Sequence, residues 1–586
     1  ACLVGAEMCI RDRYTYFSHS LKNASGAIHD KINDSFGDLL GEEEKNSLAR
    51  LLYYPERELA AAAHSDSWYR VTIHRLVAVC RQATDKYTRV KVRARLPKEY
   101  AYIIEELIDS DEHDPNKRRY FESIINSVIE TGIADRFIVA LANLISRLTV
   151  NQLHIVGDVF DRGPAAQMVM DDLMDMHGVD FVWGNHDILW LGAAAGSAAC
   201  VFTVLRISAD YGNTMTLERR YGVSLRPLYE FCERVYGDSE KKTVHQALSV
   251  LGFKLEGHVI MRHPGYEMND RLMLNRINYD DWTVELDSGT YPLNTDRFPT
   301  VDPKEPYRLT PEEEALVEEY VSAFKESQPL RRHLDFIYQK GSTYLCCNGN
   351  LLYHGCIPMT PDGKFASVRH GGKWYAGRQL MDYADAVVKS AWARGDESAL
   401  DMMWYLWCGN NSPFSGRVFH TFERAVVDDK STWVEPKNPY FSHWEDADAV
   451  RMILAEFGLD PERGHIINGH TPVKAKKGES PVKAGGRLFI IDGGFCKAYQ
   501  ATTGIAGYTL IYSSHGIRLK SHRPFEGVAK VLSENADMES DSVPVEFFPT
   551  RRYISDTDEG GRLRRRIEAL NALLAAYRAG QLQQSR

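Results

Sequence analysis

The chain has 586 residues, a formal net charge of −10 and a hydrophobic fraction of 44%. That length exceeds what one hydrophobic core usually supports, so we expect one catalytic domain with large insertions, or two to three domains. The negative charge argues against a general nucleic-acid or anionic-membrane binder, although the cations of a metal site could still attract a small anionic substrate. Ten scattered cysteines without a C-x-x-C pair favour reduced, mostly buried thiols in a cytoplasmic protein.

The first residues, ACLVGAEMCIRDR, have neither the basic start nor the long apolar stretch of a signal peptide. They resemble a translated sequencing adapter, and our hypothesis is that residues 1–13 are not native sequence. From residue 14 to 150 apolar side chains recur with helical spacing, and prolines punctuate the pattern. We expect this block to be a helical cap inserted before the strand that leads to Asp158.

Residues 151–205 are predicted to form the first part of a catalytic core. The segment His154 to Trp190 indicates strand, loop, helix, strand and loop, and its two loops read GDVFDRG and GNHD. Such a unit places both loops at the same end of a parallel sheet, where open α/β sheets bind their ligands. The apolar run Leu189 to Leu205 is too short to span a membrane and is predicted to be a buried core helix.

The residue types in these loops suit metal-assisted phosphoryl transfer. Asp158 offers a carboxylate and Asn185 a neutral amide oxygen to divalent cations, which can activate water and neutralise phosphoryl oxygens. His186 would protonate the leaving alkoxide, Asp161 would orient its ring, and Arg162 would donate to phosphate oxygens. Either motif alone is more often a turn and a helix cap, but their order and spacing together indicate a metallophosphatase.

Residues 206–340 are predicted to be a mixed insertion without a site of its own. It begins as a helix, continues as a strand over 282–286 with a hairpin turn at Asp287-Ser288-Gly289, and Pro311 opens another helix. Roles in substrate gating and in oligomer contacts both remain open for it.

Residues 341–525 are predicted to form the second part of the core. Asn348-Gly349 is a strong signal for a two-residue hairpin whose second strand ends at His354. A further strand, 464–468, is followed by Gly469 and His470, and Asp492 follows another strand as a supporting residue or a turn. The lysines after His470 are either a solvated face or a site for a second phosphate group; they are Lys474, Lys476 and Lys477.

Residues 526–586 are predicted to be a tail with an amphipathic helix. Its apolar positions are Leu563, Ile567, Leu570, Leu574 and Tyr577. That face could pack on the core or mediate self-association into a homo-oligomer.

Longer stretches around these motifs resemble one family. They are HIVGDVFDRG, WGNHDILWLGAAAGS, LLYHGCIPM and INGHTPVKAKKGESPVKAGGRLFIIDGGFCKAYQ. They are similar to the class III (bacterial, manganese-dependent) fructose-1,6-bisphosphatases of the calcineurin-like metallophosphoesterase superfamily. The resemblance implies an α/β sandwich of two sheets flanked by helices, with large helical insertions. It also implies a cytoplasmic enzyme of gluconeogenesis that removes the 1-phosphate of fructose 1,6-bisphosphate.

The resemblance further implies two Mn²⁺ ions, one of them held by Asp158, Asn185, His354 and His470. The family motif SDLHGEY is missing, because Cys9 and Arg11 stand where its aspartate and histidine would be. Pro472 stands where a compensating histidine is sometimes found. Arginine offers no lone pair and one thiolate does not rebuild a hard site, so we expect one ion to bind firmly and the activity to be weak or absent.

Two alternatives remain open. A protein serine/threonine phosphatase or another phosphomonoesterase would share GDxxDRG and GNHD. A non-catalytic sugar-phosphate-binding protein with a decayed metal site would explain the missing motif.

Overall fold

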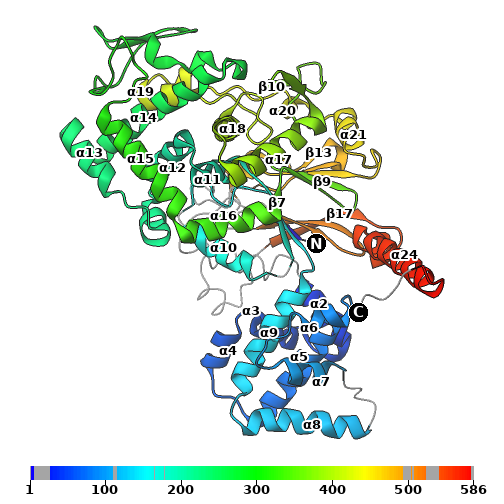
Figure 1. The fold of residues 1–586 in the computed structure, drawn as a ribbon. Coiled ribbons are helices and arrows are strands. Elements are labelled where there is room, and N and C mark those ends of the chain that lie inside the picture. The colour runs from blue at the N-terminus through cyan, green and yellow to red at the C-terminus, as the bar shows by residue number, and fades with distance from the viewer. Residues whose placement is uncertain are drawn as a thin grey trace.

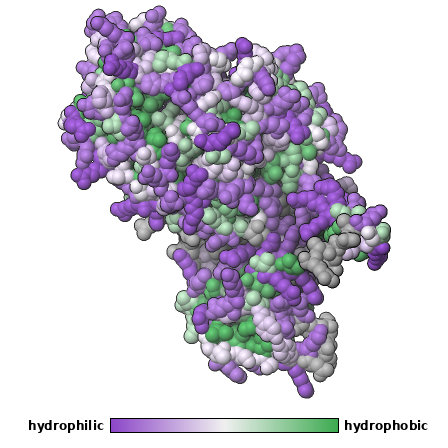
Figure 2. Space-filling model, viewed as in Figure 1, coloured by the Kyte–Doolittle hydropathy of each residue, from purple (hydrophilic) through white to green (hydrophobic). Residues whose placement is uncertain are grey.

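The computed structural model describes residues 2–4, 27–109, 115–163, 165–176, 178–492, 503–504, 507–522 and 540–581. Cys9, Arg11 and most of the segment that we hypothesise to be non-native lie outside these ranges. The described chain forms a smaller helical lobe and a larger lobe that contains both main sheets (Figure 1). No described helix is both long enough and apolar enough to cross a membrane. The visible surface of the larger lobe is mainly hydrophilic (Figure 2).

The smaller lobe consists of helices that surround a hydrophobic core of their own. Leu76 and Cys80 from one helix and Phe137 and Leu141 from another are fully buried in it. The apolar side chains that recur with helical spacing form a stripe on each helix, and these stripes face one common core, so the helices form a bundle. The helices are α2 (Ala27–Phe36), α3 (Glu42–Tyr53), α4 (Pro55–Ala61), α5 (Asp66–Thr84), α6 (Arg89–Arg93), α7 (Ala101–Asp109), α8 (Pro115–Glu130) and α9 (Ala134–Thr149).

The larger lobe contains a sheet with the strand order β17-β16-β15-β1-β2-β3-β7. Its members are β1 (Cys2–Val4), β2 (Leu153–Ile155), β3 (Val179–Val182), β7 (Gly341–Ser342), β15 (Gly507–Tyr512), β16 (Gly516–His522) and β17 (Ser540–Phe547). The strands β1, β2, β3 and β7 run parallel, and β15 joins β1 in the antiparallel sense. Helix α10 (Ala166–Met174) connects β2 to β3, so the loops after these two strands lie at one edge of the sheet.

A second sheet has the order β13-β14-β12-β9-β8. It is built from β8 (Tyr344–Cys347), β9 (Asn350–Tyr353), β12 (His465–Asn468), β13 (Val482–Lys483) and β14 (Leu488–Ile490). One buried cluster joins the two sheets, since Leu510 of β15 and Leu519 of β16 pack with Leu352, Ile467 and Phe489 of the second sheet. The fold is therefore mixed α/β, with two sheets sharing a core.

Helices cover the remaining apolar surfaces of the larger lobe. The segment predicted as one buried helix over 189–205 is instead two helices, α11 (Asn185–Ala195) and α12 (Ala198–Asp210). Gly196 ends α11 because its φ of 113° is not a helical angle, and Ser197 starts the next helix. The burial was predicted correctly, but the continuity was wrong.

The other helices and strands complete this lobe and its insertion. They are α13 (Arg226–Tyr236), α14 (Lys241–Arg262), β4 (Ile277–Asn278), β5 (Thr283–Leu286), β6 (Gly289–Pro292), α15 (Pro311–Glu326), α16 (Gln328–Lys340), β10 (Val368–His370), β11 (Lys373–Tyr375), α17 (Gly377–Arg394), α18 (Glu397–Cys408), α19 (Thr421–Val426), α20 (Tyr440–His443) and α21 (Ala447–Glu456). The hairpin of β5 and β6 and the helix start at Pro311 are both confirmed.

The carboxy-terminal helix α24 (Asp558–Arg578) extends from the larger lobe beside β17 (Figure 1). Its apolar side chains from Leu563 to Tyr577 are 40–57% exposed. The face therefore does not pack on the described core, and self-association remains a prediction.

Candidate metal and phosphate site

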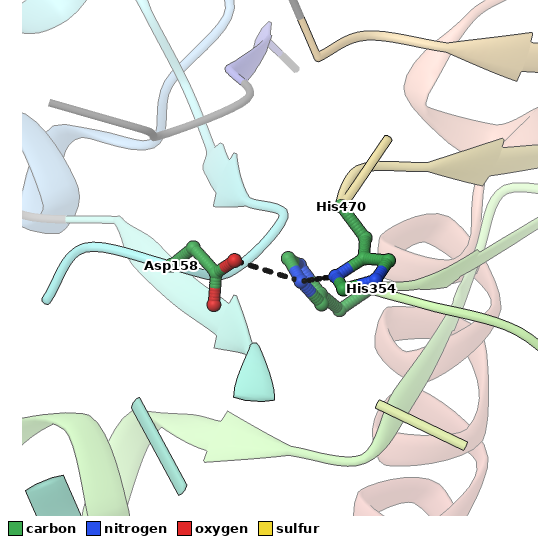
Figure 3. A group of neighbouring side chains, drawn as sticks. All are labelled: Asp158, His354 and His470. Carbon is green, nitrogen blue, oxygen red and sulfur yellow. Dashed lines mark hydrogen bonds and ion pairs between the residues drawn. The ribbon is translucent and has the colours of Figure 1, made fainter. Parts of the chain in front are cut away.

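The four side chains predicted to hold a metal come from four loops that follow strands. Asp158 lies shortly after β2, and Asn185 begins α11 just after β3. His354 directly follows β9, and His470 follows β12 of the second sheet. The two sheets thus contribute their loops to one place, and Figure 3 shows Asp158, His354 and His470 converging there.

The donor atoms of these residues are neighbours. Asp158 Oδ2 lies 3.0 Å from His354 Nε2, which lies 3.3 Å from His470 Nδ1. Asn185 Oδ1 is 3.1 Å from the same nitrogen of His470. All four side chains are buried.

This arrangement fits a divalent cation. Ligands about 2.1 Å from one ion lie about 3 Å from their neighbours, which is the spacing observed between these donor atoms. His354 Nδ1 lies 2.8 Å from the carbonyl of Val156 and donates to it, so that Nε2 is the ring nitrogen that faces the cluster. The three titratable members, Asp158, His354 and His470, are a group with the geometry to hold a metal ion.

Charges around the cluster act in opposite directions on its two histidines. Burial opposes protonation of His354, but the carboxylate of Asp158 outweighs it and raises the pKa of His354 to about 9. Burial lowers the pKa of His470 well below its usual value, and the positive charges of Arg417 and His354 lower it further. The site therefore combines an anionic ligand, a histidine paired with it and a neutral histidine.

The backbone is unusual at two of the residues predicted to bind the metal. Asp158 and His470 have φ angles of 59° and 67°, a region that non-glycine residues rarely adopt and that clusters at functional sites. Gly184 allows the β2 and β3 loops to approach, because a Cβ there would lie 2.0 Å from Asp158 Oδ1.

Asp187 is a supporting residue to which the sequence analysis gave no role, although it is the last letter of GNHD. Its carboxylate accepts hydrogen bonds from the backbone amides of Asp158 at 2.7 Å, Gly184 at 2.9 Å and Phe160 at 3.2 Å. Burial, and the nearby charge of Asp158, raise its pKa to about 6. Asp187 therefore joins the two motif loops, and its place in the motif was the signal that could have identified it.

His186 and Asp161 form a buried pair beside the cluster. His186 Nε2 lies 2.7 Å from Asp161 Oδ1, and the backbone amide of His186 donates to Asp158 Oδ1 at 3.0 Å. The ring of Trp407 meets His186 edge to face, with the centroids 4.8 Å apart. His186 Nδ1 has no hydrogen-bond partner among the described residues. Burial raises and the charge of His186 lowers the pKa of Asp161, and the net result is a lowered value.

Of the predicted phosphate-binding residues, Arg162 lies next to the His186–Asp161 pair, whereas the three lysines are exposed on a separate loop. Arg162 Nε lies 3.7 Å from Asp161 Oδ1, and the guanidinium lies over the ring of Tyr211. Lys474, Lys476 and Lys477 are exposed, the last two in the short 3-10 helix Ala475–Lys477. Asp492 is buried. Its backbone carbonyl accepts a hydrogen bond of 2.9 Å from the amide of Val473, three residues after His470.

A loop that the sequence analysis did not identify also lies at the site. It follows α18, and Pro413 accepts a hydrogen bond at 2.8 Å from the amide of Cys356, two residues after His354. The charges of Arg417 in this loop and of Lys437 both act on His470. No motif marks these two basic residues in the sequence.

Comparison with known proteins identifies one family that matches nearly the whole chain. The description "Firmicute fructose-1,6-bisphosphatase" belongs to the family profile that matches residues 7–579. A relative from Clostridium novyi (strain NT), named fructose-1,6-bisphosphatase class 3, is 46% identical over 97% of this chain and 90% of its own length. One of the same name from Porphyromonas gingivalis (strain ATCC 33277) is 45% identical over 97% of this chain and 92% of its own.

No solved structure matches the chain significantly. The sequence relationship alone establishes the family, since the matched residues 7–579 include the described helical lobe and all four loops of the site. The chain belongs to the Firmicute fructose-1,6-bisphosphatase family.

Proposed function

We propose that this chain is a metal-dependent phosphatase that hydrolyses the 1-phosphate of fructose 1,6-bisphosphate, giving fructose 6-phosphate and phosphate. The names of its relatives support this substrate. The observation that carries the proposal is the convergence of Asp158, Asn185, His354 and His470 next to the His186–Asp161 pair. Two sheets with a common core, bearing these loops, support a calcineurin-like sandwich.

The cluster is proposed to hold Mn²⁺, with Asp158 and Asn185 supplying oxygen and the two histidines supplying nitrogen. When bound, divalent ions of this kind polarise phosphoryl oxygens and lower the pKa of a bound water. Oxygen and imidazole donors also admit Fe²⁺ and Zn²⁺, so the identity of the ion rests on family resemblance. Because Cys9 and Arg11 replace the first metal motif, we expect one firmly held ion.

The remaining residues position the substrate and move a proton. His186 is the proposed general acid: Nε2 is held by Asp161, which leaves Nδ1 to carry the proton for the leaving sugar alkoxide. The buried carboxylate of Asp161 stabilises the imidazolium form and fixes the ring. Arg162, next to this pair, is proposed to donate to oxygens of the phosphate that is cleaved.

Phosphate release from the Mn²⁺-loaded protein tests the substrate. Fructose 1,6-bisphosphate and a serine phosphopeptide are offered at equal concentrations, and we expect release from the sugar alone. Release mainly from the phosphopeptide would favour a protein phosphatase. Binding of the sugar bisphosphate without release, even after the first metal motif is restored, would favour a non-catalytic binding protein.

We further propose a cytoplasmic location for the enzyme.

A further inference from the structure

Two basic residues from different loops lie next to each other on a framework that leads to the His470 loop. The backbones of Arg417 and Lys437 form an antiparallel β-bridge. The flanking hydrogen bonds run from Asn438 N to Gly416 O at 2.8 Å and from Val418 N to Pro436 O at 2.9 Å. The two side chains therefore emerge from one rigid ladder and not from independent surface loops.

A buried network fixes this ladder relative to His470. The side-chain oxygen of Asn438 accepts from the amides of Met359 at 2.9 Å and Tyr440 at 3.0 Å. The Tyr440 hydroxyl in turn donates to Asn468 Oδ1 at 2.5 Å, and Asn468 is the last residue of β12, two positions before His470. Lys437 is thus attached to the same framework that presents a metal ligand.

The positive charges in this region are only partly compensated, since Arg417 faces Glu435 at 4.0 Å and the charge of Glu479 acts on Lys437. Desolvation, and the positive charges of Arg417 and Lys474, lower the pKa of Lys437. Within the described ranges Lys437 Nζ has no carboxylate partner, and its recorded contact is with the ring of Phe441, 5.2 Å from the centroid. By contrast, nearby Lys483 is paired with Glu445 at 2.7 Å. Cations held together against their mutual repulsion, in a chain of net charge −10, indicate a site for a multiply charged anion.

We propose that Lys437 and Lys474 bind the phosphate group that the enzyme does not cleave, the 6-phosphate of fructose 1,6-bisphosphate. This inference rests on the proposed function. Lysines suit the role, since their ammonium groups act as mobile point charges toward phosphate. Of the three exposed lysines after His470, Lys474 is the nearest to it along the chain, and its charge acts on Lys437. Lys437 and Lys474 thereby determine specificity for a bisphosphate over a monophosphate.

The experiment measures ligand binding and phosphate release with the Mn²⁺-loaded full chain. The variants are Lys437→Met, Lys437→Arg and Lys474→Met. Lys430→Met is the matched control, because Lys430 is an exposed lysine of the neighbouring 3-10 helix Lys430–Trp433. Dissociation constants are measured by calorimetry for fructose 6-phosphate, which keeps the second phosphate, and for fructose 1-phosphate, which lacks it. Thermal melting checks that each variant is folded.

We expect Lys437→Met and Lys474→Met each to weaken binding of fructose 6-phosphate by about tenfold or more, the effect of losing one charge-assisted contact. Binding of fructose 1-phosphate should change less than about twofold, Lys437→Arg should restore most of the affinity, and Lys430→Met should change neither ligand. Equal losses for both ligands, or no loss for either in a folded variant, would overturn the proposal.

Phosphate release separates this proposal from the proposed function. If the unmodified protein binds fructose 6-phosphate through Lys437 but releases no phosphate from the bisphosphate, the phosphate site stands and the enzymatic function fails. If it hydrolyses the bisphosphate with the same KM in the Lys437→Met and Lys474→Met variants, the function stands and the assignment of these lysines is wrong.

Discussion

The carboxylate of Asp187 accepts a hydrogen bond of 2.7 Å from the backbone amide of Asp158. Through this bond, and those from Gly184 and Phe160, one buried side chain fixes the loop after β2 against the loop after β3. The left-handed backbone of Asp158 is held in place by this network, which offsets a conformation that costs of order 1–3 kcal/mol. Asp187 is therefore a positioning residue for Asp158, the proposed metal ligand.

Asp187→Ala should destabilise the protein and the metal site together. Three buried amides would lose their acceptor, so we expect a loss of about 3 kcal/mol or more in the free energy of unfolding. Metal affinity should fall by about ten- to a hundredfold, the range observed when outer-shell partners are removed. Urea unfolding and metal titration measure the two effects. Asp187→Asn keeps one acceptor oxygen and should lose less stability and less metal affinity. An Asp187→Ala variant with the stability and metal affinity of the parent would refute this role.

His186 and Asp161 should affect turnover without affecting metal content. His186→Gln removes the proton donor, so we expect kcat for the sugar bisphosphate to fall by about 10²–10⁴-fold. Asp161→Asn leaves the ring without its charged partner and should also lower kcat. Phosphate release is measured beside elemental analysis of bound metal. A variant that loses its metal would show that the residue supports the metal cluster instead of proton transfer.

The pair of His154 on β2 and Asp180 on β3 should make stability depend on pH. The residues face each other in the strand register, 2.5 Å apart at His154 Nδ1 and Asp180 Oδ1. Burial opposes the charge on His154, but Asp180 and Cys347 outweigh it and raise the pKa of His154 to about 9.

Because the folded pKa of His154 lies above that of the unfolded chain, its stabilising contribution is complete below about pH 6.5 and is lost as pH rises through about 9. The free energy of unfolding should fall over this interval by up to about 1.4 kcal/mol per pH unit. His154→Gln should flatten the dependence, as measured by urea unfolding at a series of pH values. An identical slope in the variant would count against the ion pair.

Restoring the first metal motif should increase both metal content and activity. By the family resemblance, we expect Cys9 and Arg11 to stand where a ligating aspartate and histidine would be, and neither offers a suitable hard donor. The double variant Cys9→Asp/Arg11→His should bind about two ions per chain, against about one in the parent, and should release phosphate faster. Unchanged stoichiometry and rate would show that the substitutions do not limit this chain.

The sequence predicted the convergence of the motif residues, but it did not predict the other residues near them. Asp158 and Asn185 follow strands that a single helix connects, and such parallel strands must end at the same edge of a sheet. The Asn348-Gly349 hairpin was also predictable, since its φ angles of 51° and 80° are those that Asn and Gly tolerate. Lys437 could not be found in this way, because its connection to the framework of His470 depends on a ladder between segments without a motif.

Two further differences between prediction and structure show what the spacing of apolar residues cannot predict. The Gly196-Ser197 step that divides α11 from α12 was visible in the sequence, but the surrounding alanines suggested a continuous helix. The face of α24 has the same spacing whether it packs on its own chain or on a partner, so its exposure could only come from the structure.

Anomalous X-ray diffraction from a crystal of the Mn²⁺-loaded protein would locate the ion directly. The geometry of the four loops predicts a peak about 2.0–2.3 Å from Asp158, Asn185 Oδ1, His354 Nε2 and His470 Nδ1. A peak elsewhere, or a loaded crystal with no density between these four side chains, would contradict the assignment of the metal site.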